Sequence, residues 1–115
     1  MEYSKFYIEI KNNLEKYHLI QETKENALAY IINCKSDARE TYDDWLEMSG
    51  IRENNLEDLV TFKVLNIGYE ISYKTDTPAE HYAVVLDVIA NGTSICTYHC
   101  LYCLDGTCDD DYILM

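Results

Sequence analysis

Hydrophobic residues in the first half of the chain recur every three or four positions, which is the spacing of amphipathic helices. The clearest stripe runs through residues 3–17, with charged side chains between its members. A second helix is predicted from Thr23, acting as the N-cap, to about Cys34. A third is predicted from about residue 36 to Gly50, because glycine commonly follows the last turn of a helix. The residues of the first stripe are Tyr3, Phe6, Tyr7, Ile10, Leu14 and Tyr17.

The hydrophobic period changes from near 3.6 to near 2 after a short helical turn predicted at 54–59, and this change predicts β-strands. The alternation changes parity around 66–68, so the first strand either contains a β-bulge or ends in a tight turn. Residues 75–78 are predicted to form a loop. Asn91-Gly92 and Asp105-Gly106 then predict hairpin turns between three further strands.

Two-residue turns at both sites would fix which residues lie opposite one another and which share a face. The predicted pairs are Val88 with Ile95, Val84 with His99, Cys103 with Cys108, and His99 with Tyr112. The more apolar face is expected to meet the helices and holds Tyr82, Val84, Leu86, Val88, Ile95, Thr97, His99, Leu101, Cys103, Cys108, Asp110, Tyr112 and Leu114. The other face combines tyrosines with carboxylates and holds His81, Ala83, Val85, Asp87, Cys96, Tyr98, Cys100, Tyr102, Leu104, Asp109, Asp111 and Ile113.

These elements predict one α+β domain over residues 1–115. Two to three N-terminal helices, within about 3–49, are expected to pack on one face of a curved antiparallel meander of four to five strands, within about 60–115. In order of elements the chain resembles the cone-shaped folds of the nuclear transport factor 2-like and cystatin-like groups, and the change of parity near Gly68 suits a strongly bent strand. The resemblance is one of topology, covers most of the chain and includes no family motif. Because such folds include enzymes, ligand binders and adaptors, it implies no single function.

The charge of the chain is strongly negative, with 21 acidic residues against 9 Lys and Arg and a formal net charge of -12. The last 41 residues, Thr75–Met115, contain seven acidic residues and no Lys or Arg. This charge disfavours direct binding to nucleic acid or to an anionic membrane and favours a basic protein partner, so we expect no nucleic-acid and no membrane partner. The sequence has no apolar run of about 20 residues, and its first residues lack the features of a secretory signal, so we expect a cytoplasmic protein.

The face rich in tyrosine and aspartate is the main candidate for partner binding. Tyrosine supplies a large amphipathic contact area, and carboxylates accept hydrogen bonds from Arg and Lys. A structural alternative is that the tyrosines shield neighbouring strands and the acids keep an edge strand soluble. The candidate partner-binding residues are His81, Asp87, Tyr98, Tyr102, Asp109 and Asp111.

The resulting functional hypothesis is a non-enzymatic binding protein that neutralises a basic partner. In general character the chain resembles small acidic bacterial immunity proteins, and the resemblance implies a toxin, such as a nuclease, as the partner. An inhibitor of phage type, directed at an enzyme that handles nucleic acid, fits the same charge argument, because such enzymes have a positive cleft. A homodimer through the exposed sheet is a further alternative, although facing carboxylates would oppose it.

An enzyme is the alternative function. A pocket between the sheet and the helices, containing His99, Asp110 and Tyr112, would suit a small-molecule binder or an isomerase- or hydrolase-like enzyme, since a histidine near a carboxylate and a phenol can transfer protons. A single histidine on an apolar face is more often a core residue whose hydrogen bonds are satisfied.

The five cysteines predict neither a metal site nor a cofactor. Cys96, Cys100, Cys103 and Cys108 do not have the spacing of a standard zinc motif, and strand alternation places Cys96 and Cys100 on the face opposite Cys103. Cys103 and Cys108 are predicted to lie close enough for a disulfide, although a reducing cytoplasm would keep them as thiols. The acidic run at 105–111 lacks the order of residues of a calcium-binding loop.

Overall fold

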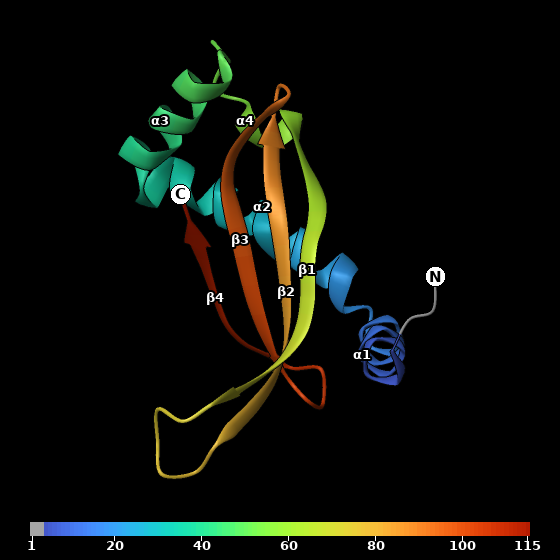
Figure 1. Ribbon diagram of the computed structural model, residues 1–115. Helices are drawn as coiled ribbons and strands as arrows, with labels where there is room; N and C mark the ends of the chain where they lie inside the picture. The colour runs from blue at the N-terminus through green and yellow to red at the C-terminus, as the bar shows by residue number, and fades with distance from the viewer. Residues whose placement is uncertain (1–3) are drawn as a thin grey trace.

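The computed structural model describes residues 4–115 and contains four helices followed by four strands (Figure 1). The strands form one antiparallel sheet in the order β1-β2-β3-β4, and this arrangement confirms the predicted α+β class. The elements are α1 (Lys5–Lys16), α2 (Leu19–Asp37), α3 (Arg39–Ser49), α4 (Leu56–Leu59), β1 (Val60–Ser72), β2 (Ala79–Ala90), β3 (Thr93–Cys103) and β4 (Cys108–Leu114). Tyr3, the first residue of the predicted helical stripe, lies outside the described residues.

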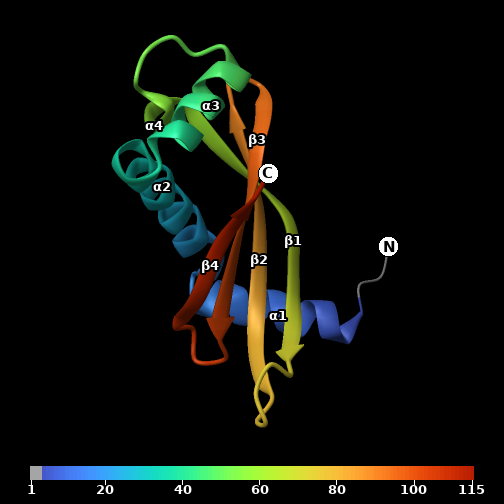
Figure 2. The same ribbon diagram turned by 90° about the vertical axis from the view of Figure 1, so that its left-hand side faces the viewer.

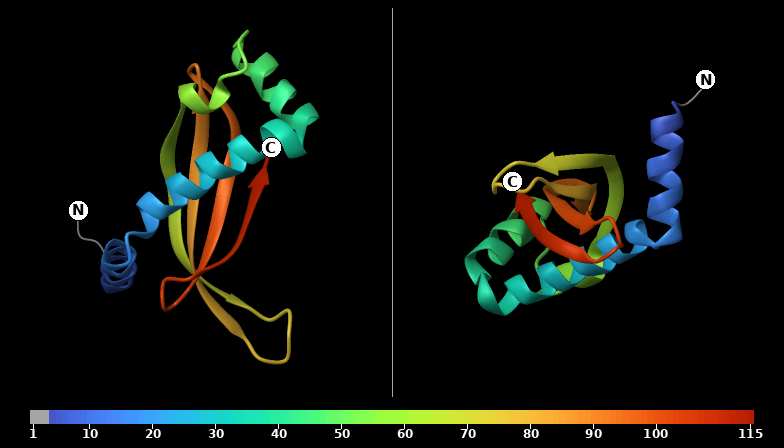
Figure 3. Two further views of the ribbon diagram at one scale, coloured as in Figure 1. Left: turned by 180° about the vertical axis from the view of Figure 1, so that it is seen from behind. Right: turned by 90° about the horizontal axis from the view of Figure 1, so that it is seen from below.

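The helices cover only one face of the sheet. Helix α2 runs diagonally across the strands (Figure 3, left), and α3 and α4 lie on the same side at one end of the sheet (Figure 2). We call the two sides of the sheet the helix-facing side and the uncovered side. The uncovered side is the one turned toward the viewer in Figure 1.

The N-cap of α2 is His18, five residues before Thr23, so the prediction that Thr23 is the N-cap is wrong. His18, which precedes the helix, has a left-handed conformation with φ of 54°. Thr23 lies within the helix, where its hydroxyl donates a hydrogen bond to the Leu19 carbonyl (2.6 Å) and lies 2.7 Å from the hydroxyl of Tyr102. Threonine therefore serves here as a buried polar link between helix and sheet. Helix α3 ends before Gly50, as predicted, and φ of that glycine is 69°.

Strand β1 is one long strand with a bulge, which resolves the two alternatives left open by the sequence. Its pairing with β2 shifts between Val64 and Asn66. The β1–β2 hairpin continues beyond the other two strands and projects from the molecule (Figure 1). The predicted loop at 75–78 lies at its tip.

The predicted register between β2 and β3 is wrong by one residue, and the error exchanges the two faces of β3. Val84 lies opposite Cys100, not His99, because a second irregularity interrupts the pairing between Val88 and Ile89. Val88 pairs with Cys96 and Ile89 with Ser94, so Ile95 is the extra residue on β3. Tyr98 and its even-numbered neighbours consequently face the helices, whereas Thr97, His99, Leu101 and Cys103 face the uncovered side.

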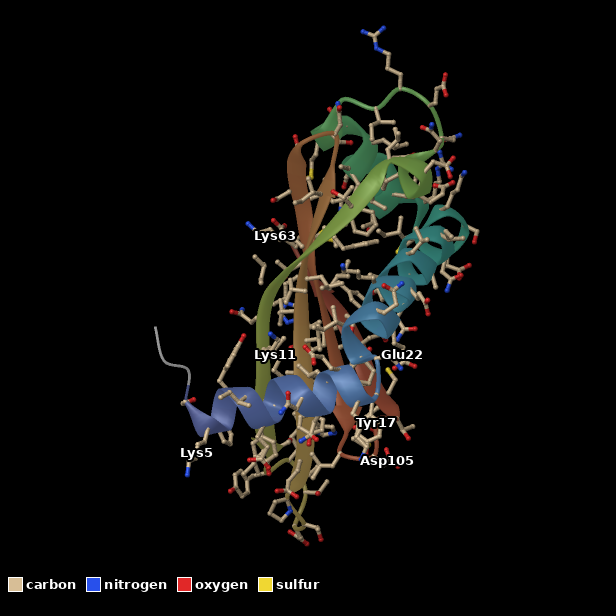
Figure 4. All side chains as sticks on the ribbon, turned by 90° about the vertical axis from the view of Figure 1, so that its right-hand side faces the viewer. Lys5, Lys11, Tyr17, Glu22, Lys63 and Asp105 are labelled. Carbon is tan, nitrogen blue, oxygen red and sulfur yellow. The ribbon has the colours of Figure 1, made fainter. Side chains whose placement is uncertain are left out.

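The connection between β3 and β4 is longer than the predicted two-residue turn. Cys103 N–H donates to the Thr107 carbonyl across it (2.8 Å), and φ of Gly106 is 92°. This turn packs against Tyr17 at the end of α1, beside the labelled Asp105 in Figure 4. The predicted pairing of His99 with Tyr112 is confirmed.

The core between sheet and helices is built largely from aromatic residues. Tyr42, Trp45, Tyr98 and Tyr102 are each no more than 1% exposed. Tyr42 and Tyr102 remain hydrogen-bonded inside the core, the first to Glu57 and the second to Thr23, because a buried phenol without a partner is costly. The fully buried aliphatic residues around them include Leu14, Leu19, Leu56, Val84 and Leu86.

Candidate functional site

The uncovered side of the sheet holds some of the predicted partner-binding residues and not others. His81 and Asp87 face this side, as predicted. Tyr98 and Tyr102 do not, because the shift in β3 turns both into the core, where they are 1% and 0% exposed. The prediction that these two tyrosines lie on the exposed face is therefore wrong.

Asp111 is bound to one of those buried tyrosines. The Tyr98 hydroxyl donates a hydrogen bond to the Asp111 carboxylate (2.5 Å), so this acid points to the helix-facing side. Burial raises the pKa of Tyr98, and the hydrogen bond to Asp111 raises it further. Tyr98 therefore remains a hydrogen-bond donor at neutral pH. Asp111 contributes to the negative charge of β4 and also holds β4 to β3 through this hydrogen bond.

His99 and Tyr112, two candidates for the predicted pocket, lie on the uncovered side instead. Their rings stack with centroids 4.7 Å apart and planes 8° from parallel. A ring nitrogen of His99 lies 2.9 Å from the Thr97 hydroxyl, and burial lowers the pKa of His99. Asp110 of β4 pairs with Leu101 and therefore also faces the uncovered side. The prediction that these residues line a space between sheet and helices is wrong, because the register shift exchanged the faces.

A small apolar platform surrounds this ring stack. Val85, Ile89 and Leu101 are half-buried on the uncovered side, and Tyr112 and Leu114 of β4 are 39% and 56% exposed. Asp87 and Asp110 lie on the same side of the sheet as this platform. We call this group the acidic sheet surface and define it by Asp87, His99, Asp110, Tyr112 and Leu114.

Most of the acidic residues in residues 75–115 have hydrogen-bond partners, but none of these partners is Lys or Arg. Within residues 4–115, the salt bridges of Lys and Arg join Lys11 to Glu15, Lys35 to Glu57 and Arg39 to Asp43. Lys63 of β1, labelled in Figure 4, lies directly opposite Asp87 of β2, so it is a cross-strand neighbour of that carboxylate on the uncovered side. Six of the seven acids in residues 75–115 accept hydrogen bonds, Asp109 from His81 and the others from uncharged groups; these five are Glu80, Asp87, Asp105, Asp110 and Asp111. The negative charge of β2, β3 and β4 is thus left without cationic side chains from its own strands.

His81, Cys103 and Asp109 form a second group, at the base of the projecting hairpin. One ligand atom from each residue lies within 4.8 Å of the others, and the His81 Nε2 to Asp109 Oδ2 distance is 2.7 Å. A cavity of about 190 Å³ adjoins them, lined in part by Glu70, Lys74 and Asp110. Cys103 was not predicted to belong to this group, because the predicted register placed it on the opposite side of the sheet from His81.

All five cysteines are free thiols. Cys96 and Cys100 lie on the face opposite Cys103, as strand alternation predicted. The predicted proximity of Cys103 and Cys108 is wrong, because Cys108 pairs with Tyr102 and its sulfur lies 3.4 Å from that of Cys100. Burial, together with the hydrogen bond to Cys100, raises the pKa of Cys108 to about 12, so this thiol is not a reactive thiolate at neutral pH.

No family model matches this chain, and no curated protein and no solved structure is significantly similar to it. The likeness to the nuclear transport factor 2-like and cystatin-like folds thus rests on the order of elements alone. Among the described residues, none of the helices is both long and apolar enough to cross a membrane.

Proposed function

We propose that this chain is a non-enzymatic acidic binding protein that neutralises a basic protein partner. The observation that carries the proposal is the charge of residues 75–115, which contain seven acidic residues and no Lys or Arg. A carboxylate surface with an excess of negative charge attracts a cationic protein over a distance of about one Debye length and speeds its association. A bacterial toxin such as a nuclease, or an enzyme that handles nucleic acid, has a positive cleft of the required sign.

The edge position of β4 supports the proposal. The strand order leaves one side of β4 without a neighbouring strand, and every residue of Cys108–Leu114 except Ile113 is exposed. An open edge offers backbone groups to an added strand, and the protective lysine common on such edges is replaced here by Asp109, Asp110 and Asp111. Self-association through this edge is opposed by like charges, whereas a basic strand or loop is attracted.

The acidic sheet surface supplies the second half of an interface. Tyr112 and Leu114 give exposed apolar area, and the half-buried Val85 and Leu101 extend it between Asp87 and Asp110. Apolar and aromatic contacts flanked by charged groups are the usual composition of a protein interface. This arrangement differs from the predicted one, because Tyr112 takes the place of Tyr98 and Tyr102.

The experiment is capture of a partner from the source cell by two matched charge variants. Asp87→Lys/Asp110→Lys alters the acidic sheet surface, whereas Glu40→Lys/Asp44→Lys alters exposed acids of α3. Each double substitution changes the net charge by the same four units, from -12 to -8. We expect a basic protein that is retained by the wild type and the α3 variant, lost with the sheet variant, and released by high salt.

Two outcomes would contradict the proposal. Equal loss with both variants would mean that net charge, and not this surface, attracts the captured protein. A second copy of the chain as the only captured partner would favour the homodimer. Neither variant alters His81, Cys103 or Asp109, the three residues of the second group described above, although Asp110 lines the cavity beside them.

A further inference from the structure

His81, Cys103 and Asp109 bring three different kinds of metal-binding atom to one place. An imidazole nitrogen, a thiol sulfur and a carboxylate oxygen lie within 4.8 Å of one another. In a tetrahedral zinc site the ligand atoms are about 3.5 Å apart, given bonds of about 2.0 to 2.3 Å. Small side-chain rotations would therefore suffice to bring all three atoms to bonding distance of one ion.

The sheet positions these residues through its pairing and through a bulge. His81 of β2 lies directly opposite Cys103 of β3, so both side chains project from the same side of the sheet. Leu101 pairs with Asp110 of β4, and the next residue, Tyr102, pairs with Cys108. Asp109 is therefore an extra residue in β4, at a bulge. Bulges often redirect a side chain at a functional site, and here the Asp109 carboxylate reaches His81.

The burial of His81 is the second and independent observation. The residue is only 6% exposed, and its Nδ1 is a buried atom without a hydrogen-bond partner among residues 4–115. Because Nε2 lies 2.7 Å from the Asp109 carboxylate, Nε2 is the nitrogen placed to bind an ion together with Asp109, and Nδ1 would then carry the ring proton.

The adjoining cavity gives an ion room and a favourable field. Its lining includes Glu70 and Asp110 as well as His81 and Asp109, against a single cation, Lys74. Glu70 lies opposite His81 in the β1–β2 pairing, so a third strand contributes a carboxylate to the same side. The excess of carboxylates favours a cation, and the space of about 190 Å³ leaves access for water or another ligand.

We propose that His81, Cys103 and Asp109 bind a divalent transition-metal ion of the zinc class, with a fourth position open to the cavity. A mixed set of nitrogen, sulfur and oxygen donors suits zinc and its cobalt substitute, whereas calcium and magnesium prefer oxygen donors alone. Three protein ligands with one open position distinguish this arrangement from a closed structural zinc site, which has four. The site goes beyond the proposed binding function and does not depend on it.

The experiment is titration of the full chain with Co²⁺, followed by competition with Zn²⁺. A non-chelating phosphine keeps the thiols reduced. We expect one Co²⁺ per chain, an absorption band from thiolate-to-cobalt charge transfer, and loss of both signals when Zn²⁺ is added. Because the thiol must lose its proton to bind, about one proton should be released per ion.

Variants show which residues are the ligands. Cys103→Ser should abolish the charge-transfer band, and Asp109→Asn should weaken the affinity by more than about tenfold, since even residues that only support a ligand contribute about that much. Cys108→Ser is the matched control, because Cys108 is an exposed thiol outside the group, and it should bind Co²⁺ as the wild type does. Circular dichroism verifies that each variant is folded. If Cys103→Ser does not fold, Asp109→Asn still tests the proposal.

The proposal is overturned by any of three results. The first is the absence of a charge-transfer band with the folded wild type. The second is unchanged binding in Cys103→Ser or Asp109→Asn. The third is loss of the band in Cys108→Ser, which would assign the ion to the neighbouring Cys100 and Cys108 sulfurs. All of these measurements are made without a protein partner, so they do not bear on the proposed function.

Discussion

Tyr98 donates a hydrogen bond to Asp111 and thereby joins the buried centre of the sheet to its acidic edge strand. The tyrosine is 1% exposed, whereas Asp111 lies on the surface. Because neighbouring residues of a strand point to opposite sides, holding Asp111 toward the helices directs Asp110 and Tyr112 to the uncovered side. One contact between core and edge therefore fixes the orientation of the proposed interface.

Removing this contact should destabilise the protein moderately. We expect Tyr98→Phe to lower the free energy of unfolding by about 1 to 2 kcal/mol, because a hydrogen bond to a charged acceptor is lost while Asp111 can still be hydrated. Urea denaturation measures the change. Tyr112→Phe, which removes the hydroxyl of a more exposed ring on the same strand pair, is the control and should have little effect. Equal effects would contradict the assigned role of the Asp111 hydrogen bond.

Alkaline pH should unfold the protein through its buried tyrosines. Burial, together with the hydrogen bond to Glu57, raises the pKa of Tyr42 from 10.0 to about 12. A raised pKa means that the folded state favours the protonated phenol, so the stabilisation is complete below pH 10 and is lost as the pH rises toward 12. Phenolate absorbance and circular dichroism, recorded together, should show a late group of tyrosines that ionise as structure is lost. Ionisation of every tyrosine near pH 10 in a folded protein would contradict this.

Glu57 should be the main acid-sensitive contact between α2, α3 and α4. Its desolvation raises its pKa, but hydrogen bonds from Lys35 (2.7 Å) and Tyr42 (2.6 Å) outweigh this effect and leave the pKa lowered. The stabilisation is therefore present above the ordinary carboxyl pKa of 4.5 and is lost as the pH falls below it. Glu57→Gln should cost about 1 to 3 kcal/mol at neutral pH and much less in acid.

A neighbouring acid provides the comparison for Glu57. Glu53 is exposed, so Glu53→Gln should leave the stability almost unchanged at either pH. Thermal unfolding of both variants across the acidic range measures the difference. If Glu57→Gln lowered the stability by the same amount at neutral and at acidic pH, the cause would be altered packing and not loss of the charged group.

Gly106 should be intolerant of a side chain because it lies against Tyr17. A Cβ at this glycine would lie 2.9 Å from two ring carbons of Tyr17, and φ of the residue is 92°. Gly106→Ala should therefore lower the stability by about 2 to 3 kcal/mol, from backbone strain and overlap together. Gly92→Ala shares the positive φ but meets no atom within 4 Å, so its smaller cost measures the strain alone. Equal melting temperatures for the two variants would contradict the packing of this turn on α1.

Much of the fold was predictable because the hydrophobic period is strong in both halves of the chain. A first helix within residues 4–17, the end of α3 before Gly50, the change to strands near residue 60 and the Asn91-Gly92 turn were confirmed, whereas α3 begins later than predicted, at Arg39. The start of α2 was predicted incorrectly because Thr23 is a good N-cap residue that tertiary contacts place inside a helix. The preference of threonine for the N-cap position was outweighed here by its buried hydrogen bonds within the helix and to Tyr102.

The faces of β3 could not be obtained from the turns alone, because a single extra residue reverses every side chain that follows. The signal that could have corrected the register is the polarity of Thr97 and His99. Both occupy positions that the predicted register assigned to the core, while Tyr98 and Cys100 occupy the alternate parity. His81 and Asp109 were predicted on one face, but the presence of Cys103 beside them escaped prediction for the same reason, since the predicted register placed Cys103 on the opposite face.

The most direct test of the proposed function is the association rate of the captured partner with the purified chain, measured at several salt concentrations. The account predicts fast association that slows steeply with salt for the wild type and for Glu40→Lys/Asp44→Lys. For Asp87→Lys/Asp110→Lys it predicts association slower by about tenfold or more, with a weaker dependence on salt. Indistinguishable rates for the two double variants would show that the acidic sheet surface is not where the partner binds.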